Sequence, residues 1–246
     1  MHCTFTEEHY RQIMVSFLEA GYRFIGFAEA DPSAERRVIL RHDVDLSIDD
    51  ALRIARIDSG LGIASCFHFL ITAEIYNLSS RAGQAAIAEI RSLGHTVGLH
   101  LDPVAIADGD MDSPDFYMRL GKLFELASLI IGKLDSYSIH RPASVGKLDN
   151  LLPERLGFPV PCFADADRYR RDMQFMSDSR RQWRQGCVCN RIDALAGRSL
   201  QLVLHPIWWP QEACTREASL EKLVRSNQTA DQYLASNLSF YNRILK

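Results

Sequence analysis

Short apolar segments alternate with helix patterns along this chain, and this alternation is what most constrains its fold. Strand-like segments are predicted at 22–27, 38–40, 63–71, 96–100, 137–140 and 201–204, with shorter ones around Phe163 and Phe175. Helix patterns lie between them, over residues 4–20, 47–60, 80–93 and 113–132, and a capping box at Thr229 predicts one more after them. Such alternation implies right-handed parallel βαβ units. The sequence therefore predicts an α/β fold whose functional groups collect at the carboxyl ends of parallel strands.

The composition bounds the class of protein. A chain of 246 residues without a linker can bury one large core, so we expect a single domain over 1–246. A formal net charge of −3 does not indicate binding to nucleic acid or to an anionic membrane. The sequence shows neither a signal peptide nor a membrane-spanning segment, which predicts a cytoplasmic protein. The six cysteines lack paired CxxC spacing and are interpreted as free structural thiols, Cys187 and Cys189 included. The sequence does not indicate an oligomeric state.

One strand-like segment ends in the pentapeptide Arg41-His42-Asp43-Val44-Asp45. Alternate residues of a strand share a face, so Asp43 and Asp45 can point into one pocket. One carboxylate could hold a metal while its neighbour transfers protons. An alternative is that the two acids open the following turn and cap the next helix. The pentapeptide alone does not decide between these interpretations.

Other chemically active side chains follow other strands. His100, His140 with Arg141, and His205 each lie at the end of a separate predicted strand. Together with the two acids they supply ligands, a general base, a general acid and a charge-holding group. This set suits metal-assisted hydrolysis of an amide or ester, since a divalent ion activates water and polarises a carbonyl.

These residues resemble, in order, the motifs of the NodB-homology polysaccharide deacetylases. That family consists of metal-dependent hydrolases on a distorted (β/α) barrel, and here the resemblance implies about seven parallel strands. Arg41-His42-Asp43-Val44-Asp45 is similar to the first motif, with Asp-x-Asp in place of adjacent acids, which implies that Asp43 is the base and Asp45 a metal ligand. The segment 94–100 is similar to the second motif, which implies that His100 is a ligand.

Three further segments carry the resemblance through the chain. Arg141-Pro142 is similar to the third motif, whose arginine orients the base. Asp178, ahead of Trp183, is similar to the fourth, an acid that tunes the catalytic histidine. Leu204-His205-Pro206 is similar to the fifth, which implies that His205 is the acid.

The chain departs from the family pattern at Val104, where the family places a second metal-binding histidine. Valine cannot bind a metal, so either another residue or water completes the shell, or the chain binds the metal weakly or not at all. Asp102 and His140 are the candidates, and His140 is preferred because imidazole suits transition metals. One divalent ion is expected, with zinc ahead of other transition metals.

The resemblance predicts a hydrolase that removes an N-acetyl or other acyl group from an amino sugar or a surface-polysaccharide precursor, such as one for lipopolysaccharide. Two alternatives stay open. One is an inactive barrel that binds carbohydrate or assists polysaccharide synthesis, and the other is a metal-dependent amidase acting on a small non-sugar amide. Trp208 and Trp209 could form a stacking wall for a sugar or belong to the core.

Overall fold

A single parallel sheet organises the chain. The structure is a computed structural model that describes residues 3–31, 33–107, 110–145, 151, 156, 159 and 161–226. Its strands are β1 (Arg23–Phe24), β2 (Arg37–Val44), β3 (Cys66–Phe69), β4 (Thr96–Leu101), β5 (Ser136–Ile139), β6 (Cys162–Phe163), β7 (Gln174–Ser177) and β8 (Leu200–Leu204). Each strand lies within or beside a segment predicted from the apolar pattern.

The strands pair in the order β6-β5-β4-β3-β2-β8-β7, and β1 adds to β2. The pairings between them are parallel. The sheet curls strongly, because Arg41 on β2 reaches Asp165, just after β6, at 3.0 Å. In a flat sheet, strands four places apart would be separated by about 19 Å. The predicted α/β fold, a distorted (β/α) barrel with about seven parallel strands, is confirmed.

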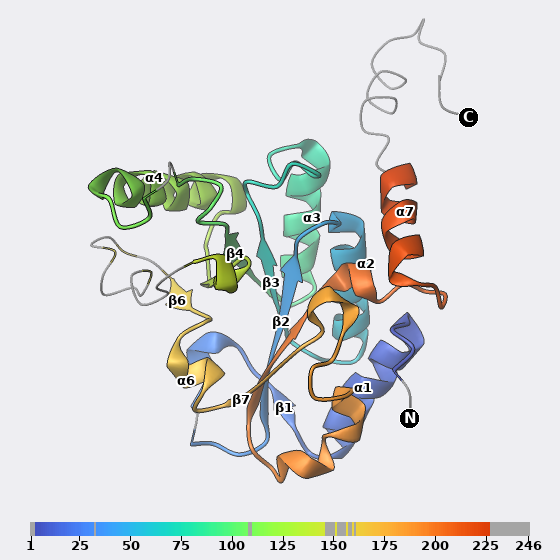
Figure 1. Ribbon diagram of the computed structural model, residues 1–246. Helices are drawn as coiled ribbons and strands as arrows, with labels where there is room; N and C mark the ends of the chain where they lie inside the picture. The colour runs from blue at the N-terminus through green and yellow to red at the C-terminus, as the bar shows by residue number, and fades with distance from the viewer. Residues whose placement is uncertain are drawn as a thin grey trace, which may run out of the picture.

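Helices connect the strands and cover the sheet (Figure 1). They are α1 (Glu7–Glu19), α2 (Ile48–Gly60), α3 (Arg81–Ser92), α4 (Pro114–Ile131), the short α6 (Asp167–Arg170) and α7 (Arg216–Ser226). Ser47, Ser80 and Ser113, where three of the predicted helix ranges start, each accept a hydrogen bond from a backbone N–H in the first turn. The first helix, predicted from residue 4, begins at Glu7 and is capped by Thr6. The helix predicted after Thr229 lies outside the described residues.

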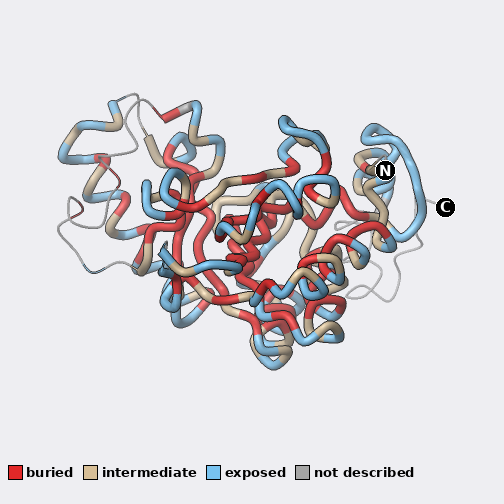
Figure 2. Tube along the Cα trace, turned by 90° about the horizontal axis from the view of Figure 1, so that it is seen from below, coloured by how far each residue is buried: buried red, intermediate tan, exposed pale blue. Residues whose placement is uncertain are grey.

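Burial is concentrated in the central strands, and the outer helix faces and loops are exposed (Figure 2). In β2 the seven residues after Arg37 are all buried, because a parallel sheet is covered on both faces. Within the described part of the chain, we find no helix whose length and hydropathy would let it cross a bilayer.

A buried polar network joins α1, α2 and β2 on the side of the sheet opposite the acids of the pentapeptide. Asp58 is fully buried, and its carboxylate accepts hydrogen bonds from the Tyr10 and Ser65 hydroxyls. The ring of His42 contacts the same carboxylate at 3.0 Å. His42 therefore serves packing between the sheet and the helices, as the alternation along its strand requires.

We expect Asp58→Ala to lower the free energy of unfolding by about 3–5 kcal/mol, because three buried polar groups lose their shared partner. Urea denaturation followed by circular dichroism measures this change. Asp49→Ala on the exposed face of the same helix is the control, and we expect it to cost less than about 1 kcal/mol. Equal effects of the two substitutions would contradict a stabilising role for the network.

Candidate metal centre and catalytic site

Arg41, Asp43 and Asp45 lie on one face at the carboxyl end of β2. Arg41 and Asp43 are inside the strand, and Asp45 follows it directly. The side chains of His42 and Val44 alternate to the other face, as the strand pattern predicts. Parallel pairing with β3 and β8 sets this end of β2 beside the ends of its neighbours. The acids are therefore not the cap of the next helix, whose N-cap is Ser47.

Three potential metal ligands meet at this end of the sheet. The Nε2 atom of His100 lies 3.3 Å from Oδ1 of Asp45. The Nδ1 atom of His140 lies 3.4 Å from the same oxygen and 3.2 Å from Nε2 of His100. The three side chains come from the ends of β2, β4 and β5. We call Asp45, His100 and His140 the His-Asp triad.

The spacing of the triad fits a small metal ion. Donor atoms bound tetrahedrally at about 2.0–2.1 Å from zinc are separated by about 3.3 Å, which is close to the three separations measured here. The Oδ1 atom of Asp45 is buried and makes no hydrogen bond, although a buried carboxylate oxygen normally has a partner. Burial disfavours the Asp45 carboxylate, yet its contacts with His100 and His140 hold its pKa well below the usual range. The residues present therefore fit a divalent metal.

Asp43 flanks the triad and is held by Arg41. The guanidinium donates from Nε and from one terminal nitrogen to the two Asp43 oxygens, both at 2.7 Å. Arg41 is itself fixed by Asp165 at 3.0 Å and by Gln201 at 3.1 Å. Burial opposes the charge on Asp43, but the Arg41 charge outweighs it and holds the pKa of Asp43 well below its usual value. Asp43 is therefore an oriented, ionised carboxylate.

This geometry corrects the role expected of Arg141. That residue adopts a left-handed backbone conformation, with φ of 47°, and its exposed guanidinium donates to Asp102 at 3.0 Å. The arginine that orients Asp43 is Arg41, which belongs to the same strand as its partner. Arg41 and Asp43 are two residues apart on one strand, so their side chains share a face. Arg141 lies beyond the end of β5, and its guanidinium is directed to Asp102.

His205 completes the other side of the site, where β8 ends. Its Nε2 faces the triad, 3.8 Å from Oδ2 of Asp45. Its Nδ1 lies 2.6 Å from Asp178, which also accepts hydrogen bonds from the His205 backbone N–H and from Nε1 of Trp209. Burial disfavours the imidazolium, but the Asp178 carboxylate outweighs this effect and raises the pKa of His205 to about 9. Asp178 therefore keeps this imidazole oriented and charged.

A pH titration of metal-free protein tests this electrostatic arrangement. We expect NMR to give a pKa near 9 for His205, and Asp178→Asn to lower it by at least about one unit. Because the folded-state pKa lies above the unfolded value of about 6.5, the stabilisation is complete below that pH and disappears as the pH rises through about 9. An unchanged pKa in Asp178→Asn would contradict the assigned partner.

A chain of hydrogen bonds positions His100 behind the metal-binding face. Its Nδ1 contacts the Ser138 hydroxyl at 2.8 Å, and Ser138 contacts Nδ1 of His68 at 2.6 Å. Nε2 of His68 then meets Ser136 at 2.7 Å. With His100 donating through Nδ1–H, its Nε2 lone pair is free for a metal. Gly98 makes room for this chain, since a Cβ there would lie 2.6 Å from the His68 ring.

The position that lacks the expected histidine is not part of the site. Val104 is exposed, and its backbone N–H donates to Asp102. Asp102 is also held by Arg141. The sequence offered Asp102 and His140 as replacement ligands. Of these two, the structure places His140 next to Asp45 and His100.

The tandem tryptophans belong to the core. Trp209 is fully buried and Trp208 is nearly so. The Trp209 ring packs against Tyr10 and Phe5, and its Nε1 supports Asp178. Of the two alternatives, a core position therefore applies to both residues. The expected sugar-stacking wall is wrong for Trp209, which has no exposed surface.

Sequence reasoning missed three residues that build the site: Arg41, Asp165 and Ser138. The strand alternation that placed Asp43 and Asp45 together also placed Arg41 on their face, so this signal was available. Asp165 and Ser138 carried no comparable pattern, since their roles depend on how the sheet curls and how β4 and β5 are aligned.

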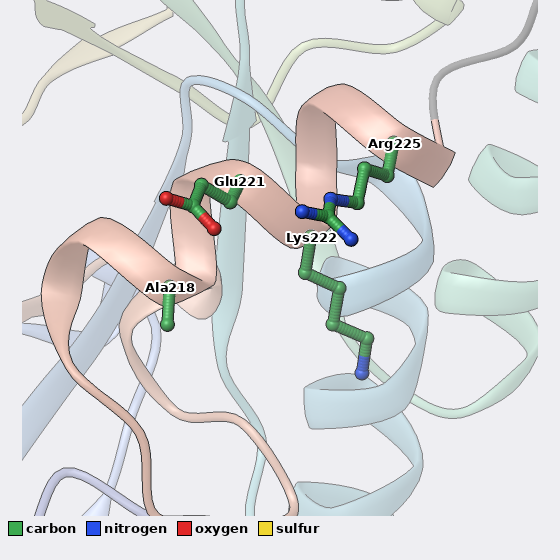
Figure 3. Close-up of a pocket in the computed structure, with 4 residues that line it drawn as sticks. All are labelled: Ala218, Glu221, Lys222 and Arg225. Atoms are coloured by element: carbon green, nitrogen blue, oxygen red, sulfur yellow. The ribbon is translucent and has the colours of Figure 1, made fainter.

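A separate hollow lies on the outside of α7, lined by Ala218, Glu221, Lys222 and Arg225 (Figure 3). All four residues are exposed and come from one helix. The hollow is therefore an exposed surface of one helix, whereas the candidate catalytic groups at the strand ends are mostly buried. We place the candidate active site at the strand ends.

No protein-family model matches the chain, and no curated protein matches it. Several solved structures are similar to it, and we describe three of them. They are the chitin deacetylase from the fungal pathogen Colletotrichum lindemuthianum (16% identity, TM-score 0.48, 79% of this chain and 84% of that one), the Streptococcus pyogenes deacetylase PplD in complex with acetate (13%, 0.46, 90% and 87%), and a family 4 carbohydrate esterase from Bacillus anthracis (12%, 0.44, 88% and 85%).

Proposed function

We propose that the chain is a metal-dependent hydrolase that removes an acyl group, preferably N-acetyl, from an amino sugar. One observation carries this proposal: the His-Asp triad lies between an ionised carboxylate, Asp43, and a charged imidazole, His205. Metal ligands, a base and an acid around one point are the parts that hydrolysis of an amide requires.

Asp45, His100 and His140 would hold the metal. Two imidazoles and one carboxylate suit zinc, and three protein ligands are the usual number at a catalytic zinc site. When bound, such an ion lowers the pKa of water to about 7 and polarises a substrate carbonyl. The Ser138 and His68 chain behind His100 would keep its ring in the required orientation.

Asp43 acts as the general base in this proposal. Its carboxylate is ionised at neutral pH, and it lies 3.8 Å from Nε2 of His100, next to the triad but outside it. Arg41 uses two hydrogen bonds to point it in one direction. A base that is held rigidly next to the attacking water gains from orientation what it lacks in intrinsic basicity.

His205 acts as the general acid. A raised pKa keeps its imidazole protonated at neutral pH, and Asp178 fixes the ring with Nε2 toward the site. An amine must be protonated to leave from an amide, whereas an alcohol leaves an ester more readily. An acid that is protonated at neutral pH therefore favours an N-acyl over an O-acyl substrate.

The sugar part of the proposal depends on the motif resemblance, and acetate release from a substrate panel tests it. We expect release from N-acetylglucosamine oligomers or a nucleotide-linked N-acetyl sugar, and less from acetylated xylan. Release only from a small amide such as acetanilide would favour the amidase alternative. The absence of turnover on the whole panel by zinc-loaded protein would favour the inactive carbohydrate-binding barrel.

Metal removal gives a further test. We expect dialysis against a chelator to reduce acetate release to background and added zinc to restore it, because the three ligands hold the metal without a fourth protein group. The control is the far-ultraviolet circular dichroism of the metal-depleted protein, because the loss of acetate release tests the catalytic metal only in a sample that keeps its folded spectrum. Full activity in a sample shown by elemental analysis to be metal-free would overturn the proposal.

A further inference from the structure

A second group of potential metal ligands lies outside the catalytic site. Cys3 and His9 come from the N-terminal segment and α1, whereas Cys187 directly precedes the short 3-10 turn Val188–Asn190 and Cys189 lies within it. His9 and Cys187 are 178 residues apart in sequence, yet Nε2 of His9 lies 3.3 Å from Sγ of Cys187. Figure 1 shows α1 beside this late segment of the chain, and the contacts between α1 and the turn agree.

The donor atoms of the group converge. Those of Cys3, His9 and Cys187 all lie within 4.8 Å of one another. The sulfur of Cys189 lies outside this group of three but 3.0 Å from that of Cys187, so that it could reach an ion held there as a fourth donor. His9 and Cys187 are buried. Buried structural thiols commonly pack as small apolar groups, whereas here the contacts of Cys187 are with other metal-binding atoms.

Three thiols and one imidazole are a donor set of structural zinc sites. We propose that Cys3, His9, Cys187 and Cys189 bind a structural zinc ion, a site independent of the proposed catalytic metal. We call these four residues the Cys3His cluster. The ion would replace weak thiol contacts with metal–ligand bonds and would join the first residues of the chain to the segment that follows β7.

The surroundings of the cluster suit this role. Nε1 of Trp183 donates to the Cys3 sulfur at 3.2 Å, and such N–H donors stabilise metal-bound thiolates. Outer partners of this kind orient ligands before the ion arrives.

The cluster also supports the catalytic site. The His9 ring stacks on Trp209, with 6.4 Å between ring centroids and 7° between planes. Trp209 donates to Asp178 at 2.8 Å, and Asp178 holds His205. Fixing His9 would therefore restrain the wall against which the proposed acid is positioned. The site would act through structure and would not contact substrate.

Elemental analysis of protein purified anaerobically with a reductant tests the proposal. With both sites filled we expect two zinc ions per chain. Cys187→Ser should lose one of them, and Asp45→Asn should lose the other. Cys214→Ser, which removes an exposed thiol bonded to Ser219, is the matched control and should keep both. If the catalytic metal alone is wrong, wild type will hold one ion that only Cys187→Ser loses.

Cobalt substitution of wild-type protein decides the matter even if Cys187→Ser does not fold. We expect thiolate-to-cobalt charge-transfer absorption in the near ultraviolet, retained in Asp45→Asn and Cys214→Ser. The proposal is overturned by the absence of this absorption in wild type. It is also overturned by an unchanged zinc content in folded Cys187→Ser, or by a Cys187–Cys189 disulfide without metal in the reduced preparation.

Discussion

Replacing Asp45 with asparagine should remove the catalytic metal and reduce deacetylation to background, a loss of about a thousandfold or more. Asparagine keeps the shape of the side chain but replaces the charged oxygen that faces His100 and His140 at 3.3 and 3.4 Å with a neutral amide. Two neutral imidazoles then have no anionic partner to offset the charge of the ion. Zinc content after dialysis and initial rates of acetate release measure the two effects together.

Asp102→Asn is the matched control for this substitution. Asp102 lies near the site and is the other acid that could replace the missing histidine, but its carboxylate is bound to Arg141. We expect this variant to keep its metal. Loss of the proposed catalytic zinc from Asp102→Asn, with that ion retained in Asp45→Asn, would show that the ligand set is assigned incorrectly.

The fold could be predicted because its signals are local. Each strand of the sheet lies within or beside a short apolar segment, and three of the main helices begin directly after Ser47, Ser80 and Ser113, where the predicted helix ranges start. Where the local pattern was weak, the elements were predicted less completely. In their described parts, residues 142–197 contain only short strands, short helices and turns. The positions of these elements depend on contacts with distant strands that no periodicity records.

The site was predictable where strand alternation decides which side chains share a face. This rule brought Asp43 and Asp45 together, and the shared ends of parallel strands brought His100, His140 and His205 to them. It could not reveal Asp165, which reaches Arg41 only because the sheet curls. Nor could it reveal the Cys3His cluster, whose members meet across most of the length of the chain.

The pentapeptide therefore contributes more to the site than two acids. β2 and the residue that directly follows it supply the arginine, the proposed base that it orients and a proposed metal ligand, at alternate positions 41, 43 and 45. A base held by its own strand needs no arginine from β5. This explains why Arg141 is free to contact Asp102 at the rim of the sheet.

Replacing Asp43 with asparagine should lower kcat by about 10²–10⁴-fold while metal content stays unchanged. The amide cannot accept a proton from water, although it fills the same space and can still accept a hydrogen bond from Arg41. Asp43 is outside the His-Asp triad, and its nearest oxygen lies 3.8 Å from Nε2 of His100. Steady-state kinetics with zinc analysis on the same samples separate the loss of a base from the loss of a ligand.

Folding must be separated from chemistry in this variant, because the Arg41–Asp43 pair is buried and its removal destabilises the protein. Thermal unfolding should show a folded protein at the assay temperature. Asp49→Asn, on the exposed surface of α2, should keep wild-type rates. A folded Asp43→Asn protein that loses its zinc would make Asp43 a ligand, and one that keeps full activity would assign proton transfer to another group. A general base at this position requires that Asp43→Asn loses its activity while it keeps both its zinc and its fold.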